Sequence, residues 1–122
     1  MSEFIFHITS RAEWLSAQQA GQYTAPSLAQ EGFIHCSTRA QVLPVANKFY
    51  KGQSGLILLG IDPARLSSVL KWEPPFEGAP PTGVSSGDLF PHIHGPLDLD
   101  AVVRVLDLES APDGSFVLPS KL

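Results

Sequence analysis

The sequence lacks several features that would assign it to a common class. Its 122 residues include a single cysteine, Cys36, so no internal disulfide framework can form. Charged residues make up only 16 %, and eight Lys and Arg against twelve Asp and Glu leave a net charge of −4. General nucleic-acid binders and anionic-membrane binders need a cationic surface, so this balance argues against both.

Targeting and membrane-spanning segments are also missing from the pattern. No apolar run approaches the ~20 residues of a membrane span. The N-terminus is acidic and leads directly into a strand-like stretch, which is not typical of a signal peptide. We therefore expect a cytoplasmic protein. No G-x-G-x-x-G or G-K-[ST] loop is present, which excludes the Rossmann and P-loop nucleotide sites, and Ser37 lacks a G-x-S-x-G elbow.

The 43 % hydrophobic content, in a chain of this length, predicts one globular core. S-x-x-E and T-x-x-Q capping boxes predict helices from Ser10 to Gly21 and from Thr38 to Tyr50; Pro44 kinks the second or marks its start. Aromatic and β-branched runs predict five strands, at residues 4–9, 33–37, 56–61, 69–73 and 101–108, and a short extended piece at 90–96. The order predicts an α+β fold.

Two regions have the composition of irregular structure. Residues 74–88 contain four prolines and three glycines, and we expect an exposed insertion or flap there. From Ser110 onward the chain is polar and carries Pro112, Gly114 and Pro119, so we expect it to fray. The predicted organisation is one domain over residues 1–108 and a polar tail over 109–122.

Two predicted strand-to-helix junctions resemble each other. Residues 7–13 (HITSRAE) align with residues 35–41 (HCSTRAQ), and each places an imidazole and a hydroxyl on one strand face beside a helix start. Helix starts carry unpaired N–H groups and a positive dipole end, so these junctions could cradle a phosphate. Helix capping and solvated arginines explain the hydroxyls and arginines equally well. The candidate ligand-binding residues are Thr9, Ser37, Thr38 and Arg39.

The four histidines, His7, His35, His92 and His94, all fall on strand-like segments. Imidazole titrates near neutral pH and is unusual inside apolar strands. Histidines from three segments that come together would therefore make an acid–base or phosphate-binding site. The stretch 32–61 contains three Lys and Arg and no acidic residue, which favours an anionic ligand. We predict His7, His35 and His92 as catalytic residues and His94 as a ligand-binding residue.

Other interpretations of the same residues remain open. His92-x-His94 with one more histidine could hold zinc, although no acid follows closely. Cys36 points away from His35 on a strand and is more typical of a buried apolar residue. Glu73, at a strand end, is a candidate base or ribose ligand or simply a rim acid.

Several stretches resemble a small bacterial family of unknown function: Phe6–Thr9, Gly32–Ser37 (GFIHCS) and Phe90–Leu97 (FPHIHGPL). That family is grouped by fold with the ADP-ribosyltransferases and the NAD-using RNA 2′-phosphotransferases. The resemblance implies an ADP-ribosyltransferase-like split, bent β core with two N-terminal βα units and a Pro/Gly-rich insertion. It also implies a cleft that accepts NAD.

By the same resemblance, His7 matches a first-strand residue that contacts the cofactor ribose, and Ser37 is the counterpart of a residue near the nicotinamide. Most transferases add a late glutamate, where this chain has His92 and His94. We expect a histidine-lined cleft that binds a nucleotide or another phosphate-bearing ligand, with NAD as the implied cofactor, and that acts as a transferase. The alternatives are a non-catalytic ligand-sensing or interaction module of the same fold and a small His-ligated metalloprotein.

Overall fold

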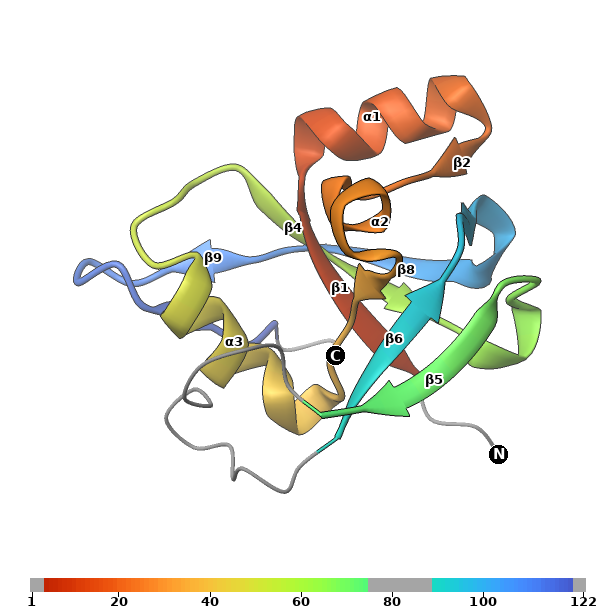
Figure 1. The fold of residues 1–122 in the computed structure, drawn as a ribbon. Helices are drawn as coiled ribbons and strands as arrows, with labels where there is room; N and C mark the ends of the chain where they lie inside the picture. The colour runs from red at the N-terminus through yellow and green to blue at the C-terminus, as the bar shows by residue number, and fades with distance from the viewer. Residues whose placement is uncertain (1–3, 75–88, 120–122) are drawn as a thin grey trace.

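The computed structural model describes residues 4–74 and 89–119, which form an α+β fold of short helices and antiparallel strand pairs (Figure 1). The helices and strands run in the order β1 (Ile5–Ser10), α1 (Arg11–Ala20), β2 (Gln22–Tyr23), α2 (Pro26–Glu31), β3 (Ile34–His35), η1 (Arg39–Gln41), α3 (Val42–Phe49), β4 (Leu56–Ile61), η2 (Pro63–Arg65), β5 (Val69–Glu73), β6 (Phe90–His94), β7 (Leu97–Asp98), η3 (Leu99–Ala101), β8 (Val102–Asp107), β9 (Glu109–Ser110) and β10 (Phe116–Val117). The insertion predicted at 74–88 lies outside the described residues except for Pro74.

The first sheet has the order β1-β4-β8 and holds the centre of the molecule. Its middle strand is the apolar run Leu56–Ile61, and every residue of it is buried. A strand buried on both faces needs no polar alternation, and this accounts for the continuous hydrophobic pattern. The sheet therefore has two covered faces.

Each face of the first sheet has its own core. Phe6, Ile8 and Leu58 pack on one side with Val42 and Ala46 of α3. On the other side Ile5, Ile57 and Leu59 pack with Trp14 and Ala17 of α1 and with Ile34 and Ile93 of the second sheet. Odd-numbered residues of β1 face this second core, because side chains alternate along a strand. His7 and Thr9 thus point between the sheets.

The second sheet has the order β3-β6-β5, and Figure 1 shows β5 and β6 as neighbouring strands. A bridge links it to the first sheet: Phe6 and Ser37 exchange backbone hydrogen bonds of 2.8 and 2.7 Å. This bridge holds β1 beside the chain that follows β3.

Capping defines the helix boundaries as the sequence predicts. The Ser10 hydroxyl accepts a 3.1 Å hydrogen bond from the Glu13 N–H, and Gly21 ends α1 with a φ of 89°. The predicted helix after Thr38 begins as the 3-10 turn η1 and continues as α3, with Pro44 in its first turn. Proline is tolerated there because first-turn N–H groups have no partner within the helix.

Between α1 and β3, the short helix α2 follows β2, which pairs with the distant β7. Residues 110–119 do not fray: β9 pairs with β10, and Phe116, only 5 % exposed, packs into the core beside α3. The polar composition of this segment did not indicate that Phe116 would be buried. No helix in residues 4–74 and 89–119 is long and apolar enough to cross a membrane.

Candidate imidazole site

Three histidine side chains share one face of the second sheet. His35 of β3 pairs with His92 of β6, and His92 pairs in turn with Lys71 of β5. Directly paired residues point to the same side of a sheet, and His94 follows His92 by two residues. The strand register therefore places the three imidazoles together.

The Phe33 ring lies at the centre of the group. It stacks on His92 with ring centroids 4.1 Å apart and an interplanar angle of 20°. The His35 and His94 rings lie 4.7 and 5.4 Å from it, and the His35 and His92 centroids are 5.3 Å apart. One aromatic side chain thus fixes the spacing of three imidazoles. We call Glu31, Phe33, His35, Glu73, His92 and His94 the imidazole cluster.

Glu73 joins two of the imidazoles through a single oxygen. Its Oε1 lies 2.8 Å from His92 Nδ1 and 2.7 Å from His94 Nε2. An ionised carboxylate only accepts hydrogen bonds, so both nitrogens carry protons. These two bonds, with His94 contributing most, lower the pKa of Glu73 below its usual value.

His92 is held in a neutral form suited to accepting a proton. Burial lowers its pKa below the ordinary value, and the hydrogen bond to Glu73 opposes that effect only in part. With Nδ1–H donated to Glu73, the lone pair of a neutral ring resides on Nε2. The pair can therefore orient a general base.

His35 has its own carboxylate partner. Its Nε2 lies 2.6 Å from Glu31 Oε2, and the His35 side chain is 40 % exposed. Glu31 is the last residue of α2 and His35 lies in β3, so a short connection brings the two side chains together. His35 is the most accessible imidazole of the cluster.

His7 of β1 is buried in the core between the two sheets, next to the backbone of His35. Its Nδ1 lies 2.5 Å from the His35 carbonyl oxygen, which fixes that nitrogen as a donor. Its Nε2 lies 2.8 Å from the Tyr23 hydroxyl, which is also 3.0 Å from the Thr9 hydroxyl. Burial lowers the pKa of His7 to about 4, so the neutral ring accepts from Tyr23. Both ring nitrogens are engaged by the protein.

The remaining predicted site residues follow β3. Ser37 is buried and bridges Phe6, while the Thr38 N–H donates to Gln41 Oε1 at 3.0 Å. Arg39 is exposed in η1. Cys36 is buried, as expected, and burial raises the pKa of its thiol. The structure brings together His35, His92, His94 and Glu73, and it places His7 and Thr9 in a separate buried network.

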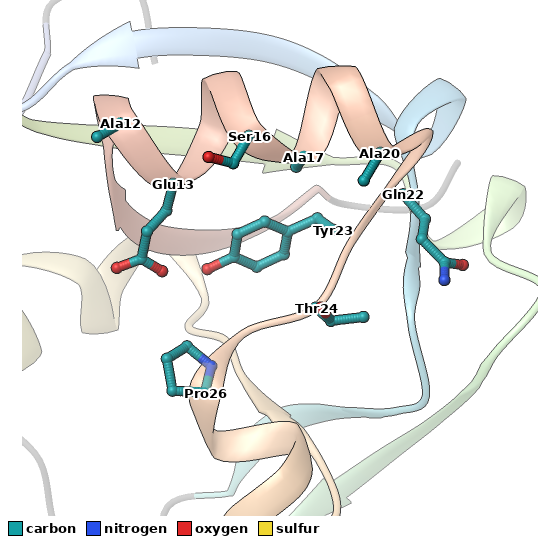
Figure 2. Close-up of a pocket in the computed structure, with 9 residues that line it drawn as sticks. All are labelled: Ala12, Glu13, Ser16, Ala17, Ala20, Gln22, Tyr23, Thr24 and Pro26. Atoms are coloured by element: carbon teal, nitrogen blue, oxygen red, sulfur yellow. The ribbon is translucent and has the colours of Figure 1, made fainter.

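A solvent-open cavity of about 470 Å³ lies beside α1 (Figure 2). None of the predicted site residues lines it, but Tyr23, the partner of His7, forms part of its wall. Within residues 4–74 and 89–119, no group of three or more His, Cys, Asp and Glu is arranged to hold a metal ion.

Sequence reasoning did not single out Glu31, Phe33 or Tyr23. Phe33 had a usable signal, because it precedes His35 by two residues in the predicted strand and so shares its face. Glu31 and Tyr23 carried no such signal, since their contacts depend on how α2 and β2 pack.

The comparisons with other proteins agree on one relationship. The model of the family "Protein of unknown function (DUF952)" matches residues 8–105. The crystal structure of protein CC0527 from Caulobacter crescentus is 37 % identical, with a TM-score of 0.78 and 94 % of each chain covered. Its solution structure is 35 % identical, with a TM-score of 0.76, covering 98 % of this chain and 96 % of that one. The comparison with curated proteins found no match. A match over most of the chain, joined to this structural similarity, shows that the chain belongs to the DUF952 family.

Proposed function

We propose that the protein binds a nucleotide or another phosphate-bearing small ligand at the imidazole cluster and acts on it as a transferase. The observation that carries the proposal is the Glu73–His92 pair, in which a carboxylate sets the tautomer of a neutral, buried imidazole. Such a pair is suited to accepting a proton from a ligand hydroxyl, for example on a ribose.

Positive charge for a phosphate is available on the same face. Lys71 is exposed and lies directly across from His92 on the neighbouring strand. Arg39 begins η1, four residues after His35 in the chain. These two cations can balance the charges of the two carboxylates in the cluster and pair with a phosphate.

NAD is the cofactor that the resemblance to ADP-ribosyltransferases implies, and we carry it into the proposal. Two three-stranded sheets joined by the Phe6–Ser37 bridge are the arrangement that a split β core would need. His7, whose ring nitrogens are both engaged, would serve in this scheme by holding the His35 backbone in place.

Isothermal titration calorimetry with NAD, ADP-ribose and a nucleoside 2′-phosphate tests the binding. We expect at least one of these ligands to bind, and Lys71→Gln to weaken its binding about tenfold or more, since a charge-assisted hydrogen bond contributes ~1.5 kcal/mol or more. Lys51→Gln, which removes the same charge from an exposed site off the sheet, is the matched control. No detectable binding of any of the three ligands would contradict the proposal.

Turnover separates the transferase from the non-catalytic alternative. Nicotinamide release from NAD, measured by chromatography, should occur with the wild-type protein and should be lost in His35→Ala. Binding without any release would identify a ligand-sensing module of the same fold. That alternative is favoured by one observation, the enclosure of His7 away from solvent.

A further inference from the structure

The cavity beside α1 has the size of a small-molecule site. Its volume of about 470 Å³ lies within the range of roughly 300–1,000 Å³ that is usual for such sites. Side chains from α1, β2 and the start of α2 line it: Ala12, Glu13, Ser16, Ala17, Ala20, Gln22, Tyr23, Thr24 and Pro26. Nothing in the imidazole cluster contributes to this wall.

The chemistry of the wall selects against a phosphate. Of the lining residues only Glu13 carries a formal charge, and that charge is negative. Alanine methyl groups and the Pro26 ring make much of the remaining surface apolar. A ligand that complements these groups has a cationic end and an aliphatic body.

The positions of the polar groups indicate how such a ligand would lie. Figure 2 shows the Glu13 carboxylate and the Tyr23 hydroxyl at one end of the cavity and the Gln22 amide at the other. The charge of Glu13 contributes to raising the pKa of Tyr23, although burial is the larger cause, and this supports their proximity. Seven residues of helix separate Glu13 from Ala20, about 10 Å. A short linear chain would fit this span.

The wall beneath the cavity is held rigidly. Tyr23 is 2 % exposed, and its hydroxyl contacts both His7 and Thr9. Its neighbour along the chain, Gln22, is paired with β7 through Asp98. A wall fixed before the ligand arrives costs little ordering entropy on binding.

We propose that this cavity binds an alkylammonium or alkylguanidinium group, with the Glu13 carboxylate accepting its N–H bonds and the alanine face of α1 contacting its methylene chain. The proposal does not rest on the function proposed for the imidazole cluster. The same chemistry is presented by a free amine and by a lysine or arginine side chain of a peptide, and the experiment distinguishes these sources.

The test is a titration of the ¹⁵N-labelled full chain followed by NMR. The probes are agmatine and n-butylamine as free cations, Nα-acetyl-lysine methylamide as a peptide lysine, and n-butanol as the neutral isostere. We expect saturable shifts in the amides of Ala17, Tyr23 and Thr24 with a cation, and none with n-butanol. Stronger binding of the acetylated lysine than of the free amines assigns a peptide source, and the reverse assigns a metabolite.

Two variant pairs give the proposal its controls. Glu13→Gln should weaken cation binding about tenfold, as expected for loss of a charged hydrogen-bond acceptor, whereas Glu109→Gln on exposed β9 should leave it unchanged. Ser16→Leu should fill the cavity and abolish binding, whereas Gln18→Leu, exposed on α1 outside the lining, should not. Absence of saturable shifts, equal binding of n-butanol, or an unaffected Glu13→Gln variant would each overturn the proposal.

Discussion

At the scale of single residues, the histidines divide into two groups with different environments. His35, His92 and His94 surround Phe33 and use carboxylates as partners, whereas His7 uses a carbonyl oxygen and a phenol inside the core. Carboxylate partners fix which ring nitrogens carry protons in the cluster. Neutral partners hold an imidazole that stays uncharged.

The first prediction concerns Glu73. Its hydrogen bond and charge raise the pKa of His92 against the effect of burial, so Glu73→Gln should lower that pKa further. NMR titration of the ring protons measures the change. Glu109→Gln, with the same loss of charge on exposed β9, should leave the His92 titration unaltered. An unchanged or higher His92 pKa in Glu73→Gln would refute the assigned pairing.

The second prediction concerns the pH dependence of stability. The His7 pKa is about 4 in the fold and near the ordinary histidine value of 6.5 in the unfolded chain, so the unfolded state binds more protons between these values. The free energy of unfolding should therefore be highest above pH 6.5 and should fall by roughly 3 kcal/mol as the pH drops toward 4. Urea unfolding at several pH values checks the slope.

His7→Gln separates this effect from other titrations. At pH 7.5 the variant should lose about 2 kcal/mol of stability, because Tyr23 and the His35 carbonyl lose a well-placed partner. Its decline toward pH 4 should be shallower, with the remainder due in part to His92, whose pKa burial also lowers. A slope identical to that of the wild type would mean that His7 titrates normally in the fold.

At the scale of the elements, the C-terminal strand pair is part of the core. Phe116 packs beside α3, and its N–H donates to the Asn47 side chain at 2.8 Å. Phe116→Ala should cost about 3 kcal/mol in chemical denaturation because it leaves a cavity. Val117→Ala, one residue further and 54 % exposed, should change stability by no more than ~0.5 kcal/mol. Equal effects of the two substitutions would show that β10 does not anchor the tail.

The elements also show how far sequence reasoning reaches. Leu56–Ile61 and Val69–Glu73 were predicted with their observed bounds, because local composition alone specifies an apolar run and a short strand between turns. The β2–β7 pair could not be predicted, since two residues carry no periodicity and their partner lies more than seventy positions away. The alternation of side chains along a strand predicts that His35 and Ser37 share one face. It does not predict which residues from other strands pack against that face.

At the scale of the whole molecule, one core spans both three-stranded sheets. Trp14 of α1, Ile57 of the first sheet and Ile93 of the second belong to the same buried group. Neither sheet can lose its packing without exposing the other, so we expect a single cooperative unfolding transition.

Tryptophan fluorescence can report on that core directly. Trp14 is 8 % exposed and Trp72 is 48 % exposed, so Trp72→Phe leaves the buried indole as the only fluorophore of its kind. Its denaturation curve should coincide with the far-ultraviolet circular dichroism curve. Two separated midpoints would indicate that the sheets unfold independently.

The enclosed thiol next to the inter-sheet bridge has a practical consequence. Cys36 is the sole sulfhydryl, and its backbone N–H is tied to Pro91 on the second sheet, one residue before the chain crosses to β1. An alkylating reagent can reach it only during moments when the two halves part. The rate at which Cys36 is alkylated therefore reports how often the structure opens around this residue. Mass spectrometry can measure that rate on the unmodified sequence.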